Sequence, residues 1–244
     1  MKSTQPIVLL HGWGFTPAVW EPLIAALTTQ GVDHDRILTP ALPFDPTGFE
    51  ATQQALIGQI PDGAHLVGWS LGGELALSLA LAASETLASL TLISSTPCFM
   101  NRDSWRIGQP ESLLDDFDAR LAADPAALLK RFGMLIRHGD ADAARNRSLA
   151  AALPGMHDTD PTRLAAGLRL LRDIDLRPRV QPLDLPCQII HGTQDAVVPF
   201  AAAEWLQRAL GADLTAIDDA SHTLPLTHAE RIAMQLRTLT GSAA

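Results

Sequence analysis

A serine held between glycines is the residue of this chain best suited to nucleophilic chemistry. Ser70 stands in Gly68-Trp69-Ser70-Leu71-Gly72, the pattern Gly-x-Ser-x-Gly, between the apolar run 65–67 and an Ala/Leu-rich stretch that continues to residue 81. This order predicts a strand, a tight turn and a helix, in which a Cβ at either outer glycine would collide with a neighbouring element. We therefore expect the turn to expose the Ser70 hydroxyl and to aim the Leu71 backbone N–H at a developing oxyanion.

Asp195 and His222 are the residues expected to activate this serine. A serine nucleophile needs a base to accept its proton and an acid to orient the base. Asp195 directly follows one predicted strand and His222 follows the last one, so both fall at the sheet edge where functional residues gather. The chain order Ser, Asp, His also accompanies this type of turn. Asp218 and Asp219 compete for the acid's role, but they neighbour His222 in sequence and would have to fold back to reach its ring.

Three other histidines lie near predicted strands or helices. His191 ends a strand, where we expect its ring to face the core. His228 falls in the first turn of a predicted helix, where we expect a solvated surface side chain. His11, in a His-Gly pair after the first strand, is typical of a structural turn. His222 is therefore the preferred base.

Composition excludes several classes of function. The 244 residues are 47% hydrophobic and carry a net charge of −9, which suits one large domain and disfavours nucleic acid as a partner. Neither Cys98 nor Cys187 belongs to a Cys-x-x-Cys pair, so no metal site or disulfide is indicated, and Cys98 is expected to be a small buried residue. Residues 1–6 are too short and polar for a signal peptide, and no apolar run approaches a membrane span. We expect a cytoplasmic monomer that needs no cofactor.

Short apolar runs alternate with helical stretches along most of the chain. Strands are predicted at 7–10, 36–38, 65–67, 90–94, 188–190 and 214–217. Helices are predicted at 17–30, capped by Thr16 and stopped by Gly31, at 50–60, after Ser70, and from Thr227, where Thr227 and Glu230 would form a capping box. The alternation predicts the α/β class, with a mostly parallel sheet and helices on both of its faces.

The alternation stops between residues 97 and 182, where no strand is indicated. Two Asp-Pro pairs, Asp124-Pro125 and Asp160-Pro161, each provide an N-cap followed by proline at the first helical position. Apolar residues repeat there at helical spacing, namely Leu113, Leu114, Phe117, Leu121, Leu164, Leu168 and Leu171. We expect an α/β core made of residues 1–97 and 183–244, and an all-helical cap made of residues 98–182.

Four motifs together resemble one enzyme family. They are Leu9-Leu10-His11-Gly12-Trp13-Gly14, Gly68-Trp69-Ser70-Leu71-Gly72-Gly73, Ser94-Ser95-Thr96-Pro97-Cys98-Phe99 and Asp175-Leu176-Arg177. In these motifs, and over nearly its whole length, the chain is similar to the pimeloyl-acyl-carrier-protein methyl ester esterases of biotin synthesis. That family belongs to the α/β-hydrolase superfamily. The turn around Ser70 alone is typical of the superfamily, whereas the combination of motifs is considerably narrower.

The resemblance implies a serine carboxylesterase that cleaves the methyl ester of pimeloyl-acyl-carrier protein through an acyl-enzyme. Ser70 would be the nucleophile, Asp195 the acid and His222 the base, and the backbone N–H groups of Trp13 and Leu71 would form the oxyanion hole. The substrate would contact Trp13, Ser70, Leu71 and His222, together with a segment of the cap that comprises Phe132, Gly133, Met134, Leu135 and Ile136. Its acyl chain would run along Trp13, Phe132, Met134 and Leu135.

The resemblance also implies an acidic carrier protein as partner, and such a partner favours a basic docking surface. Residues 120–179 carry a net charge of +4, whereas the rest of the chain carries −13. Arg131, Arg145 and Arg147 lie near the basic residues of the family's cap and are the candidates for docking. The alternative is an ordinary solvated helix surface, on which the same cations form ion pairs within the helices.

Two other functions fit the same residues. A broad-specificity carboxylesterase or thioesterase for short acyl chains would use the same triad. A non-catalytic ligand-binding protein would keep the fold and use its pocket as a receptor, although Ser70, Asp195 and His222 together favour an enzyme. A haloalkane dehalogenase is disfavoured because it would need an aspartate at position 70.

Overall fold

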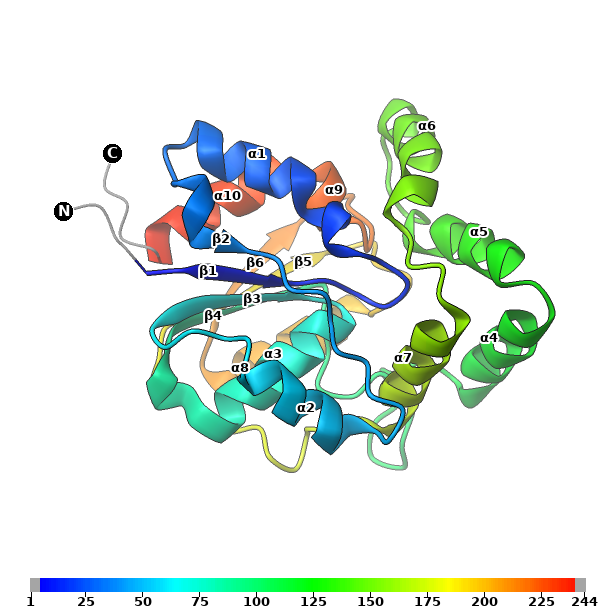
Figure 1. Cartoon of the computed structure of the whole chain (residues 1–244), viewed down its shortest axis with the longest axis horizontal. Coiled ribbons are helices and arrows are strands. Elements are labelled where there is room, and N and C mark those ends of the chain that lie inside the picture. Colours follow the sequence, from blue (N-terminus) through cyan, green and yellow to red (C-terminus); the bar gives the residue numbers. More distant parts are fainter. Residues whose placement is uncertain (1–4, 240–244) are drawn as a thin grey trace.

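One sheet of six parallel strands forms the centre of the molecule (Figure 1). The structure is a computed structural model that describes residues 5–239, apart from the side chains at 143–146 and 238–239. The strands follow the order β2-β1-β3-β4-β5-β6 across the sheet. They are β1 (Ile7–Leu10), β2 (Ile37–Leu38), β3 (Ala64–Trp69), β4 (Leu87–Ile93), β5 (Cys187–Gly192) and β6 (Asp213–Ile217). Every residue of β1 and β3 is buried, as expected for parallel strands covered on both faces.

Helices cover both faces of this sheet, as the alternating pattern predicts (Figure 1). One face is covered by α1 (Glu21–Thr29) and α10 (Ala229–Leu239), and the other by α2 (Phe49–Ile57), α3 (Leu71–Ala83) and α8 (Phe200–Leu210). Short helical turns fill the connections: η1 (Pro17–Trp20), η2 (His34–Arg36), η3 (Ser84–Thr86) and α9 (Leu224–Thr227). The prediction of the α/β class with a parallel sheet is confirmed.

Two predicted threonine caps do not form, although Thr16 does occupy the position before Pro17, the first helical residue, as predicted. Thr16 does not cap the first helix, because its hydroxyl donates a hydrogen bond to the Met156 carbonyl instead, at 3.2 Å, and the segment begins as the 3₁₀ turn η1. Thr227 does not open a capping box with Glu230. Its hydroxyl donates to the Thr223 carbonyl at 3.0 Å, because Thr227 is the last residue of the short helix α9, which begins at Leu224. In both places a nearby carbonyl competes successfully for the hydroxyl.

Helices α4–α7 lie between β4 and β5 in the chain and gather beyond the carboxyl ends of the strands (Figure 1). They are α4 (Glu111–Ala123), α5 (Pro125–Ile136), α6 (Ala143–Ala152) and α7 (Pro161–Asp173), with the turn η4 (Leu153–Met156) after α6. We call residues 98–182 the helical insertion. Both Asp-Pro starts are confirmed, because Asp124 accepts from the Ala127 N–H at 3.0 Å and Asp160 from the Thr162 N–H at 2.9 Å.

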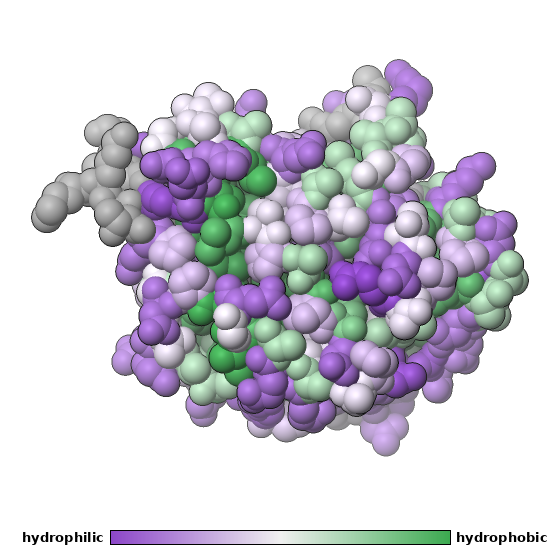
Figure 2. Space-filling model, in the orientation of Figure 1, coloured by the Kyte–Doolittle hydropathy of each residue, from purple (hydrophilic) through white to green (hydrophobic). Residues whose placement is uncertain are grey.

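The helical insertion packs its predicted apolar repeats inward. Leu114, Phe117 and Leu121 of α4 are buried, as are Leu164, Leu168 and Leu171 of α7, while Leu113 is half-buried. On the face shown in Figure 2, hydrophilic residues are spread over the insertion. Within the described residues, no helix is both long and apolar enough to cross a membrane.

Candidate active site

Ser70 occupies a strained turn between β3 and α3. Trp69 ends the strand and Leu71 begins the helix, so the serine is the single residue between them. Its φ of +56° lies in the left-handed region, which costs a non-glycine residue about 1–3 kcal/mol. A Cβ at Gly68 would lie 2.3 Å from the Gly72 carbonyl oxygen. The close approach of strand and helix that forms this turn therefore requires glycine, as predicted.

The structure brings Ser70, His222 and Asp195 together in one chain of hydrogen bonds. His222 Nε2 lies 3.0 Å from Ser70 Oγ, and His222 Nδ1 lies 2.8 Å from Asp195 Oδ2. Because a carboxylate accepts, Nδ1 carries the imidazole proton, and Nε2 presents its lone pair to the serine hydroxyl. These contacts join the ends of β3, β5 and β6, and β3 lies more than a hundred residues before the other two strands in the sequence.

Asp195 is held as an anion although it is buried. Its Oδ1 accepts hydrogen bonds from the N–H groups of Val197, at 2.9 Å, and Val198, at 2.8 Å. Burial alone would raise the pKa of Asp195, but the charge and hydrogen bond of His222 outweigh it, so this pKa lies below its ordinary value. The ionised form is the one that can orient an imidazole and stabilise its cation.

The loop that carries His222 contacts the carboxyl ends of β3 and β5. The Trp69 indole Nε1 donates to the His222 carbonyl at 2.9 Å, and the two rings lie 5.5 Å apart. On the other side, a Cβ at Gly192 would lie 2.3 Å from the Ala220 carbonyl oxygen. Sequence reasoning missed Trp69, whose only signal is its place next to the serine. Its indole links the turn at Ser70 directly to the loop that carries His222.

The competing residues lie elsewhere or have other roles. Asp218 and Asp219 are exposed. His228 lies between α9 and α10 and is half-buried, and its Nδ1 lies 2.9 Å from the Thr227 hydroxyl oxygen. The prediction of a solvated residue in a first helical turn is therefore wrong. His191 is fully buried as expected, yet its Nε2 lies only 3.5 Å from Asp195 Oδ2.

His11 is a structural residue of the loop beside Ser70. Its Nε2 accepts from the Leu42 N–H at 3.3 Å, so its Nδ1–H donates to the Gly12 carbonyl, at 2.9 Å. Burial lowers the pKa of His11 to about 4, which keeps the ring neutral. The histidine thus ties the Leu42 loop to the turn that follows β1.

The two expected oxyanion donors come from segments that pass next to Ser70. A Cβ at Gly12 would lie 3.2 Å from Ser70 Cβ, so the chain at Gly12 and Trp13 runs directly beside the nucleophile. Leu71 is the first residue of α3, where an N–H has no partner within the helix. Among the loop and turn backbone bonds of the described residues, none uses the Trp13 N–H. The Trp13 indole is anchored separately, donating to the Leu164 carbonyl of α7 at 2.9 Å.

Ser70 borders a small apolar cavity under the helical insertion. The cavity measures about 20 Å³, which is room for about one water molecule. Its other walls are Trp13, Phe99, Leu113, Leu114, Phe117, Phe132, Leu135, Leu171 and Val197. The sequence pointed to Trp13, Phe132 and Leu135, whereas the α4 side chains were expected only as a packing face. The helical spacing of these α4 side chains does not indicate that some of them lie beside Ser70.

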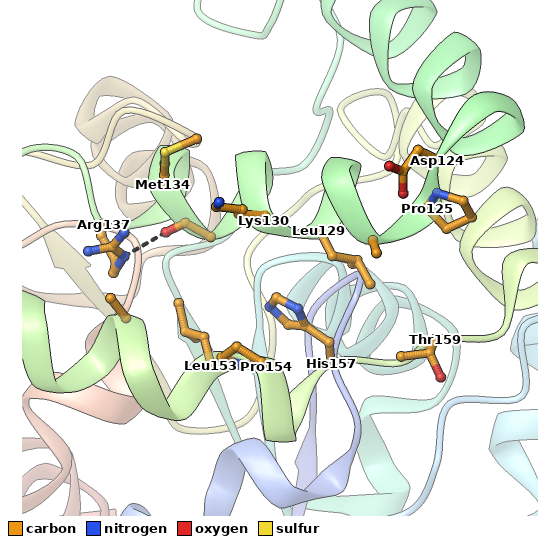
Figure 3. A pocket seen from close by; sticks show the side chains of 13 residues that line it. Asp124, Pro125, Leu129, Lys130, Met134, Arg137, Leu153, Pro154, His157 and Thr159 are labelled. Atoms are coloured by element: carbon orange, nitrogen blue, oxygen red, sulfur yellow. Dashed lines mark hydrogen bonds between the residues drawn. The ribbon is translucent and has the colours of Figure 1, made fainter.

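A larger groove of about 690 Å³ lies on the other side of α5, facing η4 (Figure 3). Leu129, Leu153 and His157 point toward one another across it, and Lys130 and Met134 stand on its α5 side. The predicted segment 132–136 is therefore divided. Phe132 and Leu135 face the cavity at Ser70, Gly133 and Met134 line the groove, and Ile136 is buried in the core without lining either.

The predicted docking arginines are only in part described. The Arg131 side chain is 52% exposed, with Nε 3.5 Å from Asp116 Oδ2. Arg147 is exposed on α6, and the Arg145 side chain lies outside the described residues. Other cations of this region also form ion pairs. Arg120 pairs within α4, as the alternative interpretation expects, whereas Arg163, Arg172 and Arg177 bind acidic side chains outside their own helix or in the loop after α7. Ion pairing thus accounts for part of the positive charge of segment 120–179.

Glu74 is a buried carboxyl one turn into α3, behind the nucleophile. Neither of its oxygens makes a well-formed hydrogen bond among the described residues. Burial raises the pKa of Glu74 well above its usual value, and the neighbouring Phe99 backbone lowers it only in part. The folded chain therefore retains a proton that the unfolded chain loses above the ordinary glutamate pKa, so this residue destabilises the fold increasingly as pH rises.

Replacing Glu74 by glutamine is expected to stabilise the protein at pH 8 by about 1–3 kcal/mol, and by much less at pH 5. Glutamine has no proton to lose, so the pH-dependent penalty disappears. Urea unfolding at the two pH values measures this difference. The exposed Glu85→Gln is the matched control and should leave the free energy of unfolding nearly unchanged. Equal effects of Glu74→Gln at both pH values would contradict the assignment of a buried neutral acid.

Comparison with known proteins gives a consistent result. Residues 7–235 match the model of the alpha/beta hydrolase family. A pimeloyl-[acyl-carrier protein] methyl ester esterase of Aromatoleum aromaticum is 41% identical over 242 residues, covering 93% of this chain and 95% of that protein. The enzyme of the same name from Vibrio cholerae is 34% identical over 241 residues, covering 95% and 92%.

Solved structures match over nearly the whole chain at lower identity. A bromoperoxidase from Bacillus anthracis superposes with a TM-score of 0.82 at 19% identity, covering 98% of this chain and 93% of that one. An enol-lactonase from Burkholderia xenovorans LB400 also gives 0.82, at 22% identity, covering 98% and 92%. At such identities the likeness concerns the fold alone.

Proposed function

The chain belongs to the α/β hydrolase family, and on this premise we propose that it is a serine carboxylesterase that hydrolyses the methyl ester of pimeloyl-acyl-carrier protein. The observation that carries the proposal is the hydrogen-bonded series Ser70–His222–Asp195, with its 3.0 and 2.8 Å contacts, in a chain 41% identical to an esterase of that name. The series supplies a nucleophile, a base and an orienting acid, which are the groups that ester hydrolysis requires.

The first half of the reaction forms an acyl-enzyme. His222 Nε2 takes the proton of the Ser70 hydroxyl while Oγ bonds to the ester carbonyl carbon, and the carbonyl oxygen becomes an oxyanion. The N–H groups of Trp13 and Leu71 stabilise this oxyanion, each donor contributing about 3 kcal/mol to lowering the barrier. The C–O bond to the methoxy group then breaks, and His222 returns its proton so that methanol departs.

The second half releases the acid. Water enters where methanol left, gives a proton to His222 and adds its oxygen to the acyl carbon. The bond to Ser70 Oγ breaks, Oγ recovers the proton from His222, and the product leaves as a carboxylic acid, which then loses its proton to solvent. Asp195 remains ionised throughout and stabilises the imidazolium that forms in each half.

The apolar cavity at Ser70 supports an aliphatic acyl chain as substrate. Its walls offer carbon atoms only, apart from the reacting groups, so a methylene chain loses no hydrogen bonds on entering. A volume of about 20 Å³ does not hold such a chain, so the side chains or helices that line the cavity must rearrange when substrate binds. We therefore assign residues 98–182 the role of a cap over the core formed by residues 1–97 and 183–244.

The carrier protein is assigned to the exposed surfaces of α5 and α6, which we call the α5–α6 face and which includes the edge of α5 where Arg131 lies beside Asp116 of α4. An acidic carrier would meet Arg131 and Arg147 there, with Lys130 at the adjoining groove, and the linker that joins the acyl chain to the carrier would lie in the groove beside Gly133 and Met134. Cys98 and Cys187 are unpaired, which is consistent with action in the cytoplasm.

The proposed function predicts that carrier attachment improves the substrate and that the α5–α6 face is responsible. We expect Arg131→Glu combined with Arg147→Glu to lower kcat/KM for the carrier-linked methyl ester about tenfold at low salt, and to leave hydrolysis of free methyl pimelate unchanged. Steady-state kinetics at two salt concentrations measure this. Arg208→Glu combined with Arg231→Glu, which reverses two exposed cations of α8 and α10, is the matched control for net charge.

Other outcomes would overturn particular parts of the proposal. Equal rates for free and carrier-linked esters, unchanged by the double variant, would instead indicate a broad-specificity esterase. No hydrolysis of any ester, p-nitrophenyl acetate included, would indicate a binding protein that keeps the fold.

A further inference from the structure

His191 lies directly behind the carboxylate of Asp195, on the side away from solvent. It is the penultimate residue of β5 and is completely buried. Its Nε2 lies 2.9 Å from the Val198 carbonyl oxygen and 3.5 Å from Asp195 Oδ2. The same Oδ2 accepts the hydrogen bond from His222 Nδ1 at 2.8 Å. One carboxylate oxygen is thus placed between two imidazole rings.

The contacts determine which nitrogen of His191 carries the proton. A carbonyl oxygen only accepts, so Nε2 must be the N–H that points at Val198 and Asp195. Nδ1 is buried and has no hydrogen-bond partner among the described residues. A second proton there would be buried without an acceptor, so the ring stays neutral with its single N–H directed at the Asp195 turn.

Val198 connects His191 to the other carboxylate oxygen. Its carbonyl accepts from His191, while its own N–H donates to Asp195 Oδ1 at 2.8 Å. His191, Val198 and Asp195 therefore form a closed ring of polar contacts. Rotation of the carboxylate away from His222 would break contacts on both of its oxygens.

We propose that His191 is a positioning residue of the esterase, which acts through Asp195 by fixing the turn 195–198 and the orientation of the oxygen that binds His222. The inference rests on the proposed function, because it assigns His222 and Asp195 their catalytic roles. Packing alone does not explain the residue. The ring meets Phe200 edge-on at 6.0 Å, a contact that an apolar side chain would also make, and an apolar side chain would avoid the unpartnered Nδ1.

The test compares two substitutions that differ in their donor. His191→Leu keeps an apolar filling and loses the N–H, whereas His191→Gln keeps an N–H at a similar distance from the backbone. With p-nitrophenyl acetate, we expect His191→Leu to lower kcat about 10- to 100-fold with little change in KM, and His191→Gln to recover most of the loss. In an Asp195→Ala background, His191→Leu should cause no further loss, because its effect passes through that carboxylate.

A readout that needs no substrate accompanies the kinetics. A proton shared between His222 Nδ1 and Asp195 gives a far-downfield proton NMR resonance. This resonance should be present in the wild type, shifted or broadened in His191→Leu, and restored in His191→Gln. It distinguishes a failure of this inference from a failure of the proposed substrate, since it reports on the contact itself.

His65→Leu is the matched control, because His65 is also buried, on β3, with Nδ1 2.9 Å from Ser89 Oγ and no contact to the triad. We expect it to change stability only. An unchanged kcat and resonance in His191→Leu would overturn the proposal, as would losses that add fully to those of Asp195→Ala.

Discussion

Ser70→Ala is expected to lower kcat for ester hydrolysis by about 10⁴-fold or more while leaving the fold intact. The alanine removes the oxygen that bonds to the acyl carbon, and no other hydroxyl is placed 3.0 Å from His222 Nε2 among the described contacts. The strained φ of +56° is unfavourable for alanine as it is for serine, so little stability is gained or lost. Hydrolysis of p-nitrophenyl acetate and a thermal unfolding curve measure the two effects.

The loss of kcat caused by Ser70→Ala should not increase when His222 is also replaced by alanine. Residues that act as one unit lose their function together, so Ser70→Ala combined with His222→Ala should be about as slow as either single variant. Ser78→Ala is the matched control, since Ser78 lies on α3, the helix that follows Ser70, and its buried hydroxyl donates to the Leu75 carbonyl. Substantial hydrolysis by Ser70→Ala would show that another residue is the nucleophile.

The sequence predicts that Ser70, Asp195 and His222 lie together, because their proximity depends on topology. Parallel strands carry their carboxyl ends to one sheet edge, so a polar residue directly after each strand must lie near the others. Asp195 and His222 follow β5 and β6, and Ser70 follows β3. Their order along the chain is therefore sufficient to predict their meeting, without knowledge of any side-chain contact.

The surroundings of the triad depend on packing and are less predictable. The rotation of α5 about its axis, relative to α4, decides whether Met134 or Leu135 faces Ser70. The hydrophobic residues of α5 form a stripe wide enough to bury both of its sides, so the sequence does not determine this rotation. His191 shows the same limitation. Its burial follows from its place in a strand, but its distance from Asp195 follows from the turn 195–198, which has no sequence signature.

Local hydrogen bonding explains why the two predicted threonine caps do not form. A Thr-x-x-Glu pattern has a capping box as one outcome, but Thr227 meets the Thr223 carbonyl one turn earlier. Asp124 and Asp160 behave as predicted because the proline after each fixes the first helical residue and leaves the carboxylate free to accept from the following N–H groups. In this chain, an N-cap residue followed by proline therefore predicts a helix start more reliably than a Thr-x-x-Glu pattern does.

Gly72→Ala is expected to reduce the free energy of unfolding by about 3 kcal/mol or more and to abolish most of the esterase activity. A Cβ at Gly72 would lie 2.2 Å from the Leu10 carbonyl oxygen and 2.5 Å from that of His11, and neither backbone group can rotate away. Helix α3 would have to separate from β1. Because Leu71 moves with α3 and Trp13 with the chain after β1, the two oxyanion donors would part, and displacements of about 1 Å at such a site cost about 100-fold in rate.

A second glycine separates this steric effect from the general effect of adding a methyl group. Gly58 follows α2 with φ of −65°, and a Cβ there would meet nothing within 4 Å. Gly58→Ala should therefore be neutral or slightly stabilising, because alanine restricts the unfolded chain. Urea unfolding and p-nitrophenyl acetate hydrolysis of both variants measure the contrast. If Gly72→Ala matched Gly58→Ala in stability and rate, the tight packing of α3 against β1 would not be what holds the nucleophile and the oxyanion donors in place.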